Sequence, residues 1–101
     1  MAVNTETALG LMKTRLNRLA ADTALDTYYG KLIDAAQEKL AGMGISLTDS
    51  TDDLLRVVNL AVWMYQNRDQ SGAMPDWMRK DIRERWLKQH QLNGEVSADE
   101  S

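Results

Sequence analysis

The chain has 101 residues, of which 44% are hydrophobic and none is cysteine. This length allows one hydrophobic core, and the lack of cysteine excludes disulfides, thiolate metal sites and thiol nucleophiles. The net charge of −3 equals the charge of three acids near the C-terminus, Glu95, Asp99 and Glu100, so the rest of the chain is neutral. A nucleic-acid-binding domain is more often strongly basic.

The sequence carries no recognisable targeting or membrane signal. The N-terminus lacks a basic-then-apolar signal pattern, and residues 57–67, the longest uncharged stretch within a periodic segment, are too few to span a membrane. Together with the lack of cysteine, this predicts a protein made in the cytoplasm, neither secreted nor embedded in a membrane.

Apolar residues recur at helical spacing, which predicts an all-α fold, a small bundle of about four helices. The first predicted helix spans residues 5–20 and places on one face Leu9, Met12, Leu16 and Leu19.

The second predicted helix follows Asp22, whose carboxylate can cap the amides of the first turn. It ends at Gly42 and Gly44, because glycine adopts the left-handed conformation at little cost. Its apolar stripe consists of Leu25, Tyr28, Tyr29, Leu32, Ile33, Ala36 and Leu40.

The third predicted helix begins after Ser50, which can accept a hydrogen bond from the amide of Asp53, and ends near Arg68. It is apolar nearly all round, as expected of a central helix. Trp63 lies on this helix and is therefore predicted to fill the centre of the core.

The fourth predicted helix starts at Pro75, because proline suits the first helical position. Its apolar row is Met74, Met78, Ile82 and Trp86, and its opposite side carries mixed charges. We expect ion pairs along the helix, from Asp76 to Lys80 and from Asp81 to Arg85. Residues 1–92 then form the helical domain, and residues 93–101 are predicted to be a disordered acidic tail.

Catalytic and metal-binding patterns are not found. The single histidine, His90, has no acidic residue at ligand spacing and offers no arranged base for any serine. Asp49, Asp52 and Asp53 lack the glycine and the terminal glutamate of a calcium loop, and helix capping explains them better. The sequence predicts no enzyme, no cofactor and no metal site.

Interface candidates lie in and before the fourth predicted helix. Trp77 is displaced by about 100° from the Met78 row, so it either packs on the preceding loop or anchors a partner. The basic residues of this helix are interleaved with three acids, which would repel DNA phosphates. A surface for protein contacts is the better interpretation, and the candidate residues are Arg68, Trp77, Arg79 and Arg83.

The order of these features resembles the small head-tail connector proteins of tailed bacteriophages. The resemblance covers roughly residues 9–92 and depends on the segment Leu-Ala-Val-Trp-Met-Tyr-Gln-Asn-Arg-Asp at 60–69, followed by Gly-Ala-Met-Pro at 72–75 and a basic helix. Its most specific part is Tyr65, Arg68 and Asp69 followed by Met74 and Pro75. The acidic tail and the N-terminal segment have no clear counterpart in that family.

This resemblance implies an adaptor without catalysis or cofactor. Its subunits form a ring beneath the portal protein after DNA packaging and present a surface to the next connector or tail component, with DNA at most passing through the channel. The implied location is the bacterial cytoplasm during assembly and then the head-tail interface of the virion. The alternative is a small helical DNA-binding protein, a regulator or packaging factor, for which the connection from Arg68 to Pro75 is long.

Overall fold

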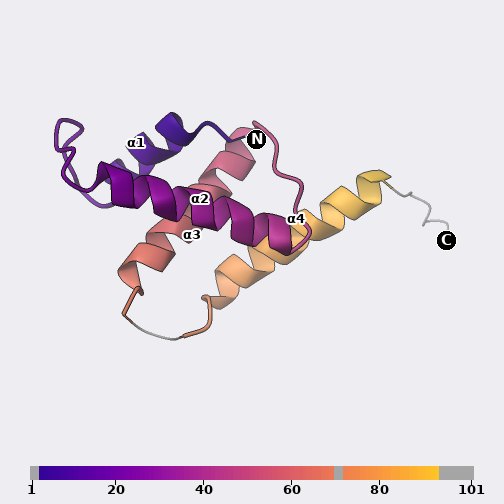
Figure 1. Cartoon of the computed structure of the whole chain (residues 1–101). Helices are drawn as coiled ribbons and strands as arrows, with labels where there is room; N and C mark the ends of the chain where they lie inside the picture. The colour runs from indigo at the N-terminus through magenta and orange to yellow at the C-terminus, as the bar shows by residue number, and fades with distance from the viewer. Residues whose placement is uncertain (1–2, 70–71, 94–101) are drawn as a thin grey trace.

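The computed structural model describes residues 3–69 and 72–93, and this part of the chain contains four helices (Figure 1). They are α1 (Thr5–Arg15), α2 (Asp26–Gly42), α3 (Thr51–Gln66) and α4 (Asp76–Asn93). No strand occurs in the described ranges, so the predicted all-α class is confirmed. The predicted acidic tail lies outside those ranges, except for Asn93, which is the last residue of α4.

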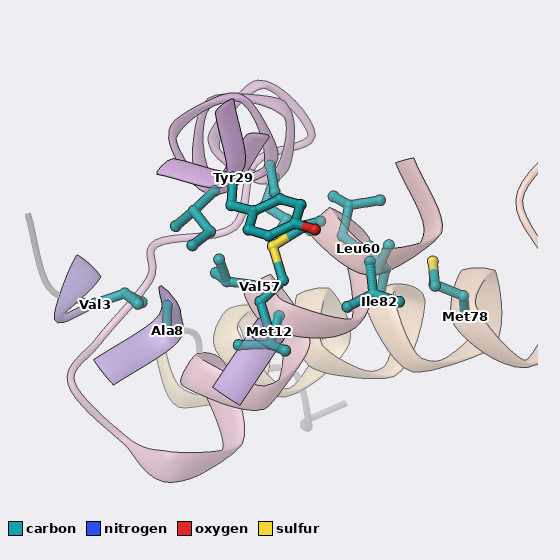
Figure 2. Close-up of a cluster of buried hydrophobic side chains, with 14 of the residues drawn as sticks. Val3, Ala8, Met12, Tyr29, Val57, Leu60, Met78 and Ile82 are labelled. Atoms are coloured by element: carbon teal, nitrogen blue, oxygen red, sulfur yellow. The ribbon is translucent and has the colours of Figure 1, made fainter. Parts of the chain in front are cut away.

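Helices α1, α2 and α3 pack against one another in all three pairings, and α4 lies across this three-helix body and extends beyond it (Figure 1). The chain is therefore elongated, with extents of 53 × 28 × 19 Å. The core is continuous between the body and α4. Met78 and Ile82 of α4 and Leu60 of α3 are buried members of one hydrophobic cluster, and Figure 2 shows all three.

The first helix ends at Arg15, a turn earlier than the predicted end at residue 20. The reason is Asn17, which adopts a left-handed conformation with φ of 60°, a state that asparagine tolerates better than most residues. The Asn17 amide donates to the carbonyl of Thr14 and the next amide to that of Lys13, which closes the helix. Leu19, predicted to face the core, is consequently 76% exposed.

The second helix starts later than predicted. The Asp22 carboxylate accepts a hydrogen bond from the Ala24 amide at 3.1 Å, which makes a local turn, and α2 begins only at Asp26. The Asp26 carboxylate pairs instead with the buried ammonium of Lys13 at 3.0 Å, so α1 is connected to the start of α2. The predicted end at Gly42 is correct.

The cap of α3 is confirmed, because Ser50 Oγ accepts a hydrogen bond from the Asp53 amide at 3.1 Å. The predicted position of Trp63 is wrong: this ring is only partly buried at the edge of the core. Pro75 immediately precedes α4, and its carbonyl accepts from the amides of Met78 and Arg79.

Candidate interaction surface on the last helix

Four charged side chains fasten α4 to the start of α3, and we call them the charged latch: Asp53, Arg56, Asp81 and Arg85. Arg85 Nε donates to Asp53 Oδ1 at 2.9 Å, and Arg56 Nη1 donates to the same oxygen at 2.6 Å. Arg56 Nε also donates to Asp81 Oδ2 at 2.8 Å. Asp53 is only 1% exposed, so the latch joins the two helices through a buried carboxylate.

The predicted ion pairs within α4 are therefore wrong. Asp81 pairs with Arg56 of α3, and Arg85 pairs with Asp53 of α3. Asp76 pairs with Arg79, not with Lys80. A buried carboxylate on a neighbouring helix is a stronger partner than an exposed one on the same helix, because less solvent screens the pair.

The latch also sets the charge state of Asp53. Burial raises the pKa of the Asp53 carboxyl, but hydrogen bonds from Arg85 and from Thr48 oppose this and lower the pKa to about 2. Burial likewise opposes the charge of Arg56, yet its hydrogen bonds to Asp81 and Asp52 raise its pKa. Both groups consequently stay charged at neutral pH.

The C-terminal half of α4 binds the loop between α2 and α3. Arg85 Nη2 donates to the Ser46 carbonyl at 2.7 Å, and Gln89 Nε2 donates to the Gly44 carbonyl at 2.9 Å. The Ser46 amide in turn donates to Gln89 Oε1 at 2.7 Å. The orientation of α4, and of everything it exposes, therefore depends on this loop.

Gly44→Ala is expected to lower the free energy of unfolding by about 1–2 kcal/mol, because Gly44 is left-handed at a φ of 92°. The added Cβ would also lie 3.0 Å from Trp86 Nε1, so it would disturb the packing of α4 against the loop between α2 and α3. Urea unfolding measures the change. Gly42→Ala is the matched control, because no heavy atom lies within 4 Å of its added Cβ, and it should not destabilise the protein. Equal midpoints for the two variants would contradict the prediction.

A groove opens on one flank of α4, where the helix passes the end of α2. It is lined by Met43, Met74, Ile82 and Trp86 together with Arg79 and Arg83, and its volume is about 410 Å³. We call it the methionine groove. Trp86 is 37% exposed within it and stacks on His90 with the ring centroids 3.7 Å apart. The groove combines a flexible apolar floor with two guanidinium groups.

The two arginines of the groove are available for contacts. Arg79 pairs with Asp76 at 2.7 Å, but both side chains are exposed, by 60% and 94%. Arg83 is exposed and forms no ion pair with another residue of the described ranges. An exposed ion pair contributes little, so either arginine can be recruited by a partner at small cost.

The four candidate residues do not form one patch. Arg79 and Arg83 share the methionine groove, whereas Trp77, 56% exposed, lies roughly 120–160° around the helix at 3.6 residues per turn. Arg68 lies in the connection after α3, where its guanidinium covers the Tyr65 ring at 4.2 Å from the centroid. All four side chains are exposed, but sequence reasoning did not separate the parts of the surface on which they lie.

Met43 was missed as part of this surface. It follows the end of α2 and comes near α4 only through the fold, so helical periodicity could not have placed it there. The spacing of Met74, Ile82 and Trp86, which predicts that they share one apolar row of the helix, was a usable signal. Only Ile82 of these is buried.

No three histidine, aspartate or glutamate side chains of the described residues gather in a way that could hold a metal ion. None of the helices over that same part of the chain has the length and apolar character needed to cross a membrane. Comparisons with protein-family models, with curated proteins and with solved structures gave no match for this chain.

Proposed function

We propose that this protein is a head-tail connector of a tailed bacteriophage, an adaptor that assembles as a ring on the portal vertex and joins the DNA-filled head to the tail. Its partners are the portal protein, neighbouring copies of itself and the next connector or tail component. It acts after synthesis in the bacterial cytoplasm and remains in the virion.

The observation that carries this proposal is the pair of dissimilar exposed surfaces on opposite flanks of α4. One flank has the methionine groove with Arg79 and Arg83, and the other has Trp77, exposed by 56%. A ring built from one subunit type needs two different, complementary faces on each copy. Aromatic and arginine side chains are the residues most enriched at the energetic centres of such interfaces.

Two further features support the proposal. The segment at residues 60–75 resembles connector proteins, and the charged latch fixes α4 firmly enough to present its flanks in a defined orientation. A DNA-binding face would instead present basic side chains to the phosphates without acidic side chains among them. On α4, Arg85 pairs with the buried Asp53 and does not face solvent as a phosphate ligand would. Two acids, Asp76 and Glu84, lie on the exposed side of the helix, where they would repel phosphates.

The test uses DNA-filled, tail-less capsids of the phage whose genome encodes the chain. We expect the purified protein to add density at the portal vertex. The double variant Arg79→Glu, Arg83→Glu and the single variant Trp77→Ala should each reduce vertex occupancy at least about tenfold, as expected of interface hot spots. Lys31→Glu, a charge reversal on an exposed position of α2, is the matched control and should bind normally.

A parallel measurement of duplex DNA binding separates the alternative. A DNA-binding protein would lose affinity steeply as salt rises, with a logarithmic slope of about 0.9 per phosphate contact. Micromolar or tighter binding to duplex DNA, with no association with capsids or isolated portal, would overturn the connector proposal. Weak DNA binding with vertex occupancy would support it.

A further inference from the structure

A cluster of three tyrosines lies at the end of the molecule where α2 begins and α3 ends (Figure 1). The Tyr65 ring of α3 meets the rings of Tyr28 and Tyr29 of α2 edge-on, at 5.9 and 5.2 Å between the centroids. The methionine groove lies at the other end of α2, because Met43 is about 21 Å beyond Tyr29 along the helix axis. The tyrosine cluster is therefore a separate surface.

Two exposed arginines bring positive charge to this cluster. The Arg68 guanidinium covers the face of the Tyr65 ring, and its Nη1 donates to the Tyr65 carbonyl, which holds the side chain there. The Arg18 guanidinium comes from the connection between α1 and α2. Its contacts with the hydroxyl of Tyr65, and then with that of Tyr29, raise the pKa of Arg18. Both guanidinium groups thus converge on the Tyr65 side chain.

No carboxylate of the described residues pairs with these two arginines. Within residues 3–69 and 72–93, neither Arg18 nor Arg68 forms an ion pair, and Asp69, the residue after Arg68, is no exception. Two positive groups held at one side chain repel each other, and an anion bound between them lowers this electrostatic energy. The arrangement therefore favours an anionic ligand.

The cluster also contains a buried hydroxyl that lacks a hydrogen bond. Tyr29 is 1% exposed, and its hydroxyl makes no hydrogen bond within the described part of the chain. Leaving a buried polar group unpaired costs free energy, so such groups usually have a partner in the functional state. The Tyr65 hydroxyl is close by. Its oxygen can accept a hydrogen bond from Tyr29 when its own proton is donated to a ligand on the exposed side.

We propose that Arg18, Arg68 and the Tyr65 hydroxyl bind a phosphate group. Guanidinium groups recognise phosphate through paired hydrogen bonds. Three residues donate here, and a terminal phosphate offers three acceptor oxygens, whereas a carboxylate offers two. A phosphate monoester carries a charge of about −1.5 to −2 at neutral pH, which matches two guanidinium groups better than the single charge of a carboxylate. In the bound state the Tyr65 hydroxyl donates to the phosphate and accepts from Tyr29.

Titration of the isotope-labelled full-length protein with inorganic phosphate, at constant ionic strength, tests this site. We expect saturable shifts of the Nε–H signals of Arg18 and Arg68, with half-saturation at millimolar phosphate or below. Arg18→Gln and Arg68→Gln should each weaken binding at least about tenfold, because each removes hydrogen bonds to a charged group. Tyr65→Phe keeps the ring beneath Arg68 but removes the hydroxyl donor, and it should also weaken binding about tenfold.

Two matched variants serve as controls. Arg83→Gln removes the same charge from an exposed position of α4 that forms no ion pair with a described residue. Tyr28→Phe removes a hydroxyl from the same cluster, one that does not contribute to the pKa of Arg18. Both variants should bind phosphate as the unchanged protein does. Circular dichroism confirms that every variant is folded.

Further ligands identify the source of the phosphate group. Glycerol phosphate is a monoester, and binding as tight as that of inorganic phosphate would assign the site to phosphate groups on larger molecules. Binding of inorganic phosphate alone would assign it to the free ion, and either result supports the proposal. Acetate supplies a carboxylate in the same buffer and should bind at least about tenfold more weakly than phosphate.

Three outcomes would overturn the proposal. The first is a phosphate affinity that persists in both Arg18→Gln and Arg68→Gln. The second is acetate binding as tight as that of phosphate, which would make the cluster a contact for acidic side chains of a partner protein. The third is a set of shifts that grow linearly with phosphate and never saturate, because screening of surface charge without a binding site gives that result.

Discussion

Asp53→Asn is expected to lower the free energy of unfolding by about 3–5 kcal/mol, the usual cost of removing one partner from a buried ion pair. The side chain keeps its shape, but Arg56 and Arg85 lose the carboxylate oxygen that both of them contact, at 2.6 and 2.9 Å. Two guanidinium groups would then face each other with little solvent to separate them. Urea unfolding measures the loss, and α4 should separate from α3 first.

Asp52→Asn is the control for this prediction. Asp52 pairs with the same arginine, Arg56, at 2.9 Å, but its side chain is 71% exposed. The loss of an exposed pair should cost only about 0–1 kcal/mol. If the two variants were equally stable, the buried latch would contribute no more than a surface ion pair, and our account of how α4 is held would be wrong.

The same carboxylate predicts how stability depends on pH. The pKa of Asp53 falls from its ordinary value of 3.8 to about 2 in the folded protein, so the unfolded chain takes up a proton more readily. The contribution of Asp53 is complete above about pH 4 and is lost as the pH falls toward 2. It amounts to about 2 kcal/mol. Asp53→Asn should flatten this part of the stability curve, whereas Asp52→Asn should retain it.

Helix boundaries were predictable where a local group decides them. Ser50 caps α3 through a bond to an amide three residues away, and Gly42 ends α2 as expected. The turns at Asn17 and Asp22 were not predicted, because each of these residue types has two local options. Asparagine can continue a helix or end it in the left-handed state, and aspartate can cap a helix or make a turn of its own. Packing of the remaining chain selects between them.

The partners of the charged residues could not be predicted from their spacing. Asp81 and Arg85 are four apart and suited to pair along one helix, yet each contacts α3 instead. Such a choice depends on which side of α4 faces the body, which is a property of the tertiary structure. The methionine groove has the same origin, because Met43 and Trp86 are brought together only when the two helices cross.

Trp63 illustrates a different limit of the periodic pattern. A helix that is apolar nearly all round does not reveal which side faces the centre, and size alone suggested the tryptophan. In the folded chain the smaller Val57 and Leu60 are fully buried on α3, while Trp63 lies at the edge. The largest fully buried side chain is Tyr29 of α2.

Tyr29→Ala is therefore expected to be among the most destabilising single substitutions in the core, with a loss of about 3–5 kcal/mol. The Tyr29 side chain is 1% exposed, and its ring meets that of Tyr65 edge-on with 5.2 Å between the centroids. Figure 2 shows it beside Met12 of α1, so its removal leaves a cavity where α1, α2 and α3 meet. A loss of this size approaches the whole stability of a small domain, and thermal unfolding should begin near room temperature.

Tyr28→Ala is the neighbouring control for this loss. Tyr28 is 40% exposed and contacts the same Tyr65 ring at 5.9 Å between centroids, so it shares the aromatic contact but not the burial. We expect a cost of about 1 kcal/mol, the value of an aromatic pair without a cavity. If Tyr28→Ala were as damaging as Tyr29→Ala, the aromatic contacts with Tyr65 would decide the stability of the body. A much larger effect of Tyr29→Ala would show that it is the volume filled between the three helices that holds them together.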